Sequence, residues 1–255
     1  MTDLHSRCRL AAKGRNVLVS EWDQAAIVRH EQIISGRDLS FKHITMPTTL
    51  RLANLAPHHR VLDVGCGSGV LTKRLASECQ EVVGIDPAPQ YILIAREFCR
   101  NTHNALFVEG FVEDQSIGTI GRFDVAVANM VLMDCANLDI VLSSVAEFLT
   151  PAGCLVATIT HPFFWAKYWG YDTEPWYQYE TELEIEAPFA ISTQACDFVT
   201  THFHRPLSHY AAALAKSGMA LTEIEEPMPT EPVAQHYPSP WKFPRFLAFR
   251  AVKLS

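Results

Sequence analysis

A glycine-rich turn follows a short apolar run in the stretch VLDVGCGSG at residues 61–69. Glycine lets the main chain approach a ligand closely, where a Cβ atom would clash. Asp86 comes 21 residues after Gly65, at the end of a second apolar run. A carboxylate at that position can accept hydrogen bonds from both hydroxyls of a ribose. The spacing therefore predicts a ligand with a nucleoside part, held between the turn and Asp86.

The composition of the turn does not favour a pyrophosphate. Nicotinamide-binding turns follow the pattern G-x-G-x-x-G, and Val70 occupies the position of the last glycine. Asp63, two residues before Gly65, would repel a pyrophosphate but suits a ligand that carries an ammonium and a sulfonium. A nicotinamide-dependent oxidoreductase stays an alternative, which direct binding of each cofactor would separate.

Four features in order along the chain resemble the class I S-adenosylmethionine-dependent methyltransferase family, in its small-molecule branch. They are the glycine-rich turn, Asp86, the strand opening Phe123-Asp124 and the turn at residues 149–153. The resemblance covers about residues 60–160 and implies S-adenosyl-L-methionine as the cofactor. It places Asp63, Gly65 and Gly67 along the methionine part, Asp86 on the ribose, Pro87 beside the adenine, and Asn129 near the ammonium through main-chain carbonyls.

The adenine contact departs from the family pattern. Relatives usually carry an acidic residue after the third strand, near the adenine amino group, whereas here Phe111 follows Gly110. Either Glu113 or Asp114 takes that role, or the adenine contact is mostly apolar and involves Phe111.

Short β-branched runs alternate with helical periodicity between residues 60 and 160. Strands are expected at 60–64, 82–85, 105–108, 123–128 and 154–160, and the clearest helix covers 138–149. This helix should stop at residues 150–153, because proline cannot continue a helix and glycine accepts positive φ. Strand–helix alternation produces right-handed βαβ units.

With closing strands at 221–224 and 246–252, the sequence predicts an α/β, Rossmann-like fold. It comprises a seven-stranded, mostly parallel sheet with helices on both faces, one reversed edge strand, and an aromatic insertion after the fifth strand.

The expected domain organisation has two parts. Residues 1–58 form an N-terminal helical cap, with a helix opened by Ser20 and Asp23 that runs to about Ile34 and another over 47–55. Residues 59–255 form the methyltransferase domain. Within it, residues 162–204 form a substrate-side insertion, with a hairpin of segments 179–186 and 197–204, and a helix follows over 206–217.

His161 directly follows the fifth expected strand, at the sheet edge where ligands bind in open α/β folds. A histidine there can act as a general base, since its ordinary pKa is near 6.5. The alternative is a structural histidine that anchors the loop bent by Pro162, and the sequence leaves both open.

Aromatic residues gather between Phe163 and Tyr179. Aromatic side chains on a loop at this edge commonly form a pocket wall or lid, so Phe163, Trp165, Trp169 and Tyr171 are candidate acceptor contacts. The same cluster could instead be the core of an insertion.

The sequence predicts no metal site. Seven cysteines occur without a CxxC pair, and reduced thiols are the simpler interpretation. His202, His204 and His209 lack an acidic or cysteine partner at ligand spacing, which favours structural roles.

Composition restricts the binding partners that can be expected for this protein. The net charge of −7 disfavours nucleic acid, and neither an apolar run of membrane-spanning length nor a leader is visible, so we expect a cytoplasmic protein.

The expected function is methylation of a small apolar or aromatic metabolite, mainly on oxygen, as in specialised metabolism. The alternatives are N- or C-methylation and a non-catalytic S-adenosylmethionine-binding protein. The oligomeric state stays open.

Overall fold

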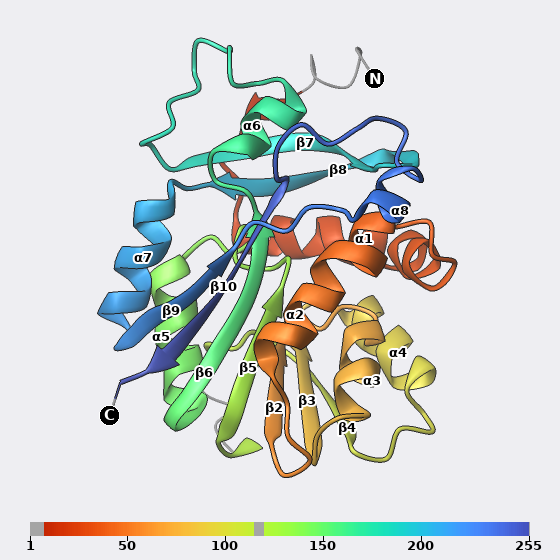
Figure 1. Ribbon diagram of the computed structural model, residues 1–255, viewed down its shortest axis with the longest axis vertical. Helices are drawn as coiled ribbons and strands as arrows, with labels where there is room; N and C mark the ends of the chain where they lie inside the picture. The colour runs from red at the N-terminus through yellow and green to blue at the C-terminus, as the bar shows by residue number, and fades with distance from the viewer. Residues whose placement is uncertain (1–7, 115–119, 255) are drawn as a thin grey trace.

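The computed structural model describes residues 8–114 and 120–254 (Figure 1). Residues 1–7, 115–119 and 255, which fall in the predicted cap and methyltransferase domain, lie outside the described residues. Seven strands form the main sheet in the order β4-β3-β2-β5-β6-β10-β9. They are β2 (Arg60–Val64), β3 (Glu81–Asp86), β4 (Ala105–Glu109), β5 (Phe123–Asn129), β6 (Leu149–Thr160), β9 (Met219–Glu225) and β10 (Phe246–Lys253). The predicted seven-stranded, mostly parallel Rossmann-like sheet is confirmed.

The reversed strand lies inside the sheet, so the prediction of a reversed edge strand is wrong. β10 pairs in antiparallel fashion with β6 on one side and with β9 on the other, which leaves β9 at the edge. The run Phe246 to Phe249 is almost completely buried, as a strand covered on both faces requires. Glu223 and Glu225 of β9 suit an edge beside solvent.

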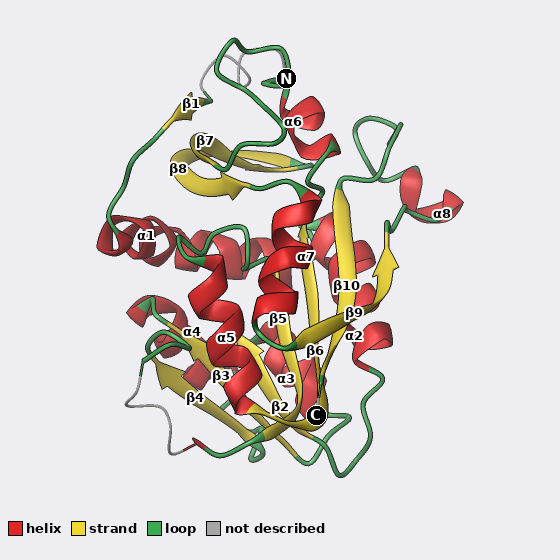
Figure 2. Cartoon of the chain, turned by 90° about the vertical axis from the view of Figure 1, so that its left-hand side faces the viewer, coloured by secondary structure: helices red, strands yellow, loops and turns green. Residues whose placement is uncertain are grey.

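Helices cover both faces of the main sheet, as predicted (Figures 1 and 2). On one face lie α2 (Met46–Ala53), α3 (Val70–Ala76) and α4 (Pro89–Phe98), and on the other lie α5 (Leu138–Phe148) and α7 (Leu207–Lys216). Val61 and Leu62 are both fully buried, in the separate apolar clusters on the two faces. Burial on both faces explains why the strands of the parallel part contain near-continuous apolar runs.

The helix α5 ends at Phe148, as expected, but the conformation of the turn that follows differs from the prediction. The positive φ falls on Ala152, at 61°, and not on a glycine. A Cβ atom on Gly153 would lie 2.9 Å from the Thr150 carbonyl oxygen. Gly153 is therefore needed for a close main-chain approach.

A second, three-stranded antiparallel sheet lies beyond the carboxyl ends of the parallel strands (Figure 2). It consists of β1 (Arg9–Leu10), β7 (Leu183–Ile191) and β8 (Gln194–His204), in the order β1-β7-β8. The hairpin expected from the insertion is confirmed, with longer strands than predicted. Beside it, α6 (Phe164–Trp169) contributes Trp169 to a small core that also contains Tyr171 and Ile185.

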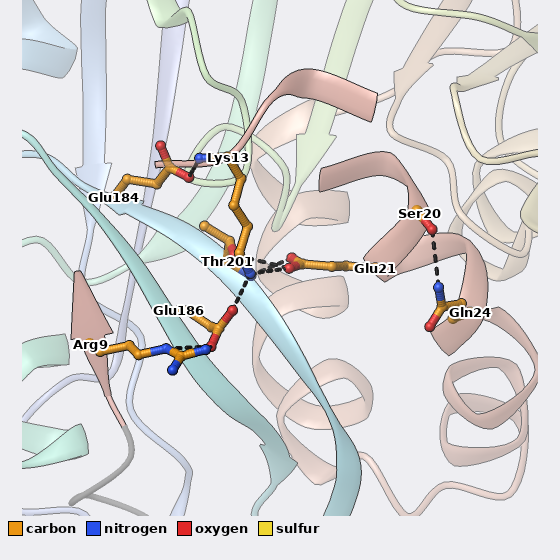
Figure 3. Close-up of polar contacts among 8 residues, drawn as sticks. All are labelled: Arg9, Lys13, Ser20, Glu21, Gln24, Glu184, Glu186 and Thr201. Atoms are coloured by element: carbon orange, nitrogen blue, oxygen red, sulfur yellow. Dashed lines mark hydrogen bonds and ion pairs between the residues drawn. The ribbon is translucent and has the colours of Figure 1, made fainter. Parts of the chain in front are cut away.

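The N-terminal helix α1 (Arg15–Ile34) begins five residues before the predicted start at Ser20. The Ser20 hydroxyl does not cap it but accepts a hydrogen bond from Gln24 within the helix (Figure 3). Asp23 accepts a hydrogen bond from the Gln90 main chain and so links α1 to α4. A π-helix, η2 (Phe41–Thr45), leads into α2, and α8 (Glu231–Ala234) lies in the connection before β10. Within the described ranges, no helix is both long and apolar enough to cross a bilayer.

A charged network ties the N-terminal segment and α1 to the second sheet (Figure 3). Lys13 forms ion pairs with Glu21 of α1 and Glu186 of β7, and its ammonium also donates to the Thr201 hydroxyl, 2.9 Å away. Glu21 in turn accepts a hydrogen bond from the Thr201 main-chain N–H. The hydrogen bond from Lys13 lowers the pKa of Glu186 below its usual value. One cation therefore holds the N-terminal segment and α1 against a hairpin that is distant in sequence.

We expect Lys13→Met to reduce the free energy of unfolding by about 1–3 kcal/mol, because two partly buried carboxylates lose their shared cation. Urea unfolding at neutral pH measures this change. The control is Lys216→Met, whose ion pair with Asp139 is more than half exposed on both sides and should cost at most about 1 kcal/mol. Equal losses in the two variants would show that the network does not anchor the N-terminal segment.

Candidate functional site

A cavity of about 500 Å³ lies at the carboxyl ends of the parallel strands, within the size range of small-molecule sites. Side chains of α1 and of the β7–β8 hairpin, including Trp22 and Phe189, complete its wall. One part of the cavity is lined by all seven residues predicted to bind the cofactor: Asp63, Gly65, Gly67, Asp86, Pro87, Phe111 and Asn129. The structure brings these residues together from the ends of β2, β3, β4 and β5.

The glycines of the first turn are required by geometry. Gly65 has a φ of 64°, and a Cβ atom there would overlap the side chain of Val131. Val131 reaches this position because the chain turns sharply after Asn129, where Met130 adopts a φ of 60°. Gly67 also has a positive φ, at 51°. The two turns are thus packed against each other, with main chain rather than side chain facing the cavity.

Asp86 links the first turn to the second. One carboxylate oxygen accepts a hydrogen bond from the Gly67 N–H and the other from the Ala88 N–H, both at 2.9 Å. Burial raises the pKa of Asp86 to about 6, although these hydrogen bonds oppose the shift. Each carboxylate oxygen has a further lone pair, so Asp86 can still accept hydrogen bonds from a ligand in the cavity.

Asp63 is almost completely buried beneath the same turn. Its carboxylate accepts a hydrogen bond of 2.6 Å from the Thr72 hydroxyl of α3. Burial raises the pKa of Asp63 to about 7. Since no cation pairs with Asp63 in the described residues, a ligand ammonium would stabilise its charged form.

The position expected for the adenine has an aromatic wall and an acidic neighbour. The guanidinium of Arg15 lies 3.2 Å from the centre of the Phe111 ring and also pairs with Glu113. Glu113 lines the cavity. Asp114 instead accepts a hydrogen bond from the Phe111 N–H within the loop. Of the two acidic residues left open by the sequence, Glu113 is therefore the one placed beside the cavity.

The aromatic insertion contributes only part of its predicted contacts. Trp165 and Trp169 line the cavity. Phe163 is 58% exposed and contacts the rings of Phe164 and Tyr179 instead. Tyr171 is fully buried behind the wall, where its hydroxyl lies 3.1 Å from Nε2 of His202. The cluster thus serves both as a cavity wall and as the core of the insertion.

His161 lies outside the set of residues that line the large cavity. Its Nδ1 accepts hydrogen bonds from the Phe163 and Phe164 main-chain N–H groups at the start of α6. Its Nε2 lies 2.7 Å from a carboxylate oxygen of Glu226. Because both ring nitrogens are engaged, this geometry favours the loop-anchoring alternative over the general base.

Two further histidines have structural partners. His204 Nε2 donates to the Tyr179 carbonyl oxygen at 2.9 Å, and His202 pairs with Tyr171. Burial lowers the pKa of His202 to about 3, so this ring is neutral. Across residues 8–114 and 120–254, no group of three or more histidine, cysteine and acidic side chains is arranged to hold a metal ion.

Sequence reasoning missed several residues of the cavity wall. Asp134 lies five residues after the end of β5, and burial raises its pKa well above the usual value. Tyr168 of α6 and Arg245, just before β10, line the part of the cavity beside Trp165. Tyr168 belongs to the predicted aromatic cluster. Nothing in the sequence around Arg245 indicates a binding site, because only the fold brings this residue to the cavity.

Comparison with known proteins finds methyltransferases among the relatives of this chain. The family described as "Methyltransferase domain" matches residues 62–155. An uncharacterized methyltransferase of Schizosaccharomyces pombe is 32% identical over 125 residues, which cover 48% of this chain and 47% of that protein. A ubiquinone biosynthesis O-methyltransferase of Glaesserella parasuis is 30% identical over 131 residues, covering 47% and 56%. The chain thus spans about half the length of the curated relatives it matches.

Solved structures share the fold over a larger part of the chain. An S-adenosylmethionine-dependent methyltransferase from Mesorhizobium loti has a TM-score of 0.60 and 20% sequence identity. The match covers 81% of this chain and 96% of the other. At this identity, the likeness establishes the fold.

The titration of Asp63 predicts how ligand affinity depends on pH. An ammonium ligand binds the carboxylate form and lowers its pKa, so affinity rises as the pH rises through about 7, the value in the free protein. We expect S-adenosylhomocysteine to bind about tenfold more tightly at pH 8 than at pH 6, as measured by calorimetry.

Two controls isolate the carboxylate. Asp63→Asn keeps an oxygen that can accept from Thr72 and should flatten the pH profile. 5′-Methylthioadenosine lacks the ammonium and should show a smaller dependence. An affinity for S-adenosylhomocysteine that is constant or falls from pH 6 to pH 8 would exclude Asp63 as the ammonium partner.

Proposed function

Since residues 62–155 match a methyltransferase domain, we propose that the chain is a class I S-adenosylmethionine-dependent methyltransferase that transfers the methyl group to a small, largely apolar or aromatic acceptor. The observation that carries this proposal is the continuity of the cavity. The same cavity is lined by Asp63 and Asp86 on one side and by Trp165 and Trp169 on the other. A cofactor on the first side would present its methyl group to a molecule on the second.

Methyl transfer depends mainly on the relative position of the acceptor atom and the methyl carbon. The acceptor atom attacks the methyl carbon in line with the carbon–sulfur bond, and the bonding pair returns to sulfur as a neutral thioether. No acid is needed at this leaving group, because its positive charge disappears. The protein's contribution is to hold acceptor atom and methyl carbon at about 3 Å, with water excluded by the apolar walls.

An oxygen acceptor remains our proposal for the acceptor atom, with nitrogen or carbon as alternatives. The partial match to ubiquinone biosynthesis O-methyltransferases supports oxygen. A hydroxyl must lose its proton during transfer, and two residues are candidates to accept it. His161 is the candidate from sequence, whereas Asp134 is the candidate whose side chain lines the cavity. Burial raises the pKa of Asp134, which makes its carboxylate a stronger base.

Two other functions predict different cavities. A non-catalytic S-adenosylmethionine-binding protein needs the cofactor half alone, and the aromatic half then has no purpose. A nicotinamide-dependent enzyme would place a pyrophosphate against the first turn, where Asp63 and Asp86 are buried. Both alternatives are less consistent with the residues present than methyl transfer is.

The role of Asp86 can be tested with a ligand that lacks one hydroxyl. In wild type, S-adenosylhomocysteine should bind about 10- to 100-fold more tightly than its 2′-deoxy analogue, because the hydroxyl donates to a charged acceptor. In Asp86→Asn this ratio should fall toward one. The ratio is informative because Asp86 also holds two main-chain N–H groups, so both ligands share any structural cost of the substitution. An unchanged ratio in the variant would show that Asp86 does not bind the ribose.

A pair of variants decides between the two candidate bases. With a hydroxyl acceptor identified by release of S-adenosylhomocysteine, Asp134→Asn should lower kcat by about 10²–10⁴-fold if Asp134 is the base. His161→Gln should give that loss if the base is His161. In the variant that loses activity, the cofactor affinity measured by calorimetry should stay within a few fold of wild type. Near wild-type rates in both variants would exclude both residues as the base.

A further inference from the structure

Arg245 is a buried cation at the wall of the cavity. Its side chain lines the cavity, and the residue is only 5% exposed. The guanidinium carbon lies 4.0 Å from the ring centre of Tyr168 and 4.3 Å from that of Trp241. Among residues 8–114 and 120–254, no carboxylate lies within ion-pair distance of Arg245. Burial lowers its pKa, and the groups that oppose the shift are the phenols of Tyr168 and Tyr237 rather than a carboxylate.

Two other arginines, the buried Arg205 and the partly buried Arg29, are compensated. Arg205 is 2% exposed and pairs with Glu182 while it donates to main-chain carbonyls. Arg29, which lines the same cavity, pairs with Asp38 at 2.9 Å. An uncompensated buried cation is costly, and packing alone would be served by an apolar side chain. The arrangement of Arg245 therefore suits an anion that enters from the cavity.

The position of Arg245 in the sheet separates it from the predicted cofactor residues. Those residues lie at the carboxyl ends of β2, β3, β4 and β5, whereas Arg245 precedes β10, two strands beyond β5. The spacing of neighbouring strands puts these two positions about 10 Å apart. The Arg245 carbonyl accepts a hydrogen bond of 2.9 Å from the His161 N–H, which fixes this segment against the end of β6. The guanidinium thus belongs to the aromatic, acceptor half of the cavity.

We propose that Arg245 binds the carboxylate of the acceptor, so that the substrate class is an apolar or aromatic monocarboxylic acid. This inference rests on the proposed function. One guanidinium neutralises one negative charge, and its planar fork matches a carboxylate. Arg15 and Arg29, which line the same cavity, already pair with carboxylates and so do not supply a second positive charge for a phosphate dianion. Tyr168 and Trp165 provide the aromatic surface for the rest of the molecule.

The carboxylate acts as an anchor in this proposal. Hydrogen bonds from a guanidinium withdraw electron density from carboxylate oxygens and reduce their nucleophilicity. The group that receives the methyl therefore lies elsewhere on the acceptor, toward the end of β5. The roughly 10 Å between β5 and β10 is enough to accommodate one aromatic ring and its substituents.

The test compares acids with their neutral amides on protein saturated with S-adenosylhomocysteine. Suitable pairs are phenylacetate with phenylacetamide and indole-3-acetate with indole-3-acetamide, titrated to millimolar concentration by calorimetry. In wild type, at least one acid should bind about 10- to 100-fold more tightly than its amide. Arg245→Met should abolish this preference, and Arg245→Lys should retain part of it. Arg29→Met is the matched control, since Arg29 lines the cavity but already pairs with Asp38. It should leave the preference unchanged.

The proposal fails if no acid binds wild type more tightly than its amide, a result that does not require any variant to fold. It also fails if Arg245→Met weakens S-adenosylhomocysteine about tenfold or more but leaves 5′-methylthioadenosine unaffected. That outcome would assign Arg245 to the amino-acid carboxylate of the cofactor. The proposed function is tested separately, by binding of S-adenosylhomocysteine to wild type and by its release in the acceptor assay. A protein that binds this ligand but shows no acid preference overturns only the inference about Arg245.

Discussion

The hydrogen bonds that Asp86 accepts from Gly67 and Ala88 hold the two cofactor-side turns in a single arrangement. The turn after β2 and the turn after β3 are both short and both leave main-chain N–H groups directed at the sheet edge. A buried carboxylate between them satisfies those groups and keeps the turns at a fixed separation. The close packing of Gly65 under Val131 adds the turn after β5 to the same unit. The cofactor half of the cavity is therefore rigid because three strand ends are locked to each other.

The acceptor half is built differently. Its walls come from α1, the β7–β8 hairpin, α6 and the segment before β10, which are held by contacts between distant parts of the chain. The Lys13 network joins two of these segments, α1 and the hairpin, and aromatic packing around Trp169 and Tyr171 completes the second sheet. A site of this kind can change its acceptor by changes in the hairpin and in α6, while the cofactor turns stay constant. This division explains why the cofactor can be inferred more readily than the acceptor.

Sequence alone predicted the parts governed by local rules. The parallel strands, the helices between them and the cofactor turns follow from apolar periodicity, glycine position and the spacing from Gly65 to Asp86. The start of α1 was missed, because Ser20 resembles a cap but lies inside the helix. Three other features depend on long-range packing. They are the position of β10 within the sheet, the separation of His161 from the cavity, and the positions of Arg245 and Asp134 at the cavity wall. No local pattern in the sequence indicates whether β9 or β10 pairs with β6.

A crystal structure of the protein with S-adenosylhomocysteine tests the central claim most directly. The account predicts the ribose hydroxyls on Asp86, the ammonium near Asp63 and Asn129, and the sulfur facing the chamber bounded by Trp165, Tyr168 and Arg245. That arrangement would place the methyl group of the cofactor in the path of an acceptor. A ligand bound elsewhere, or bound with its sulfur sealed from that chamber by protein, would contradict the assignment of the cavity to methyl transfer.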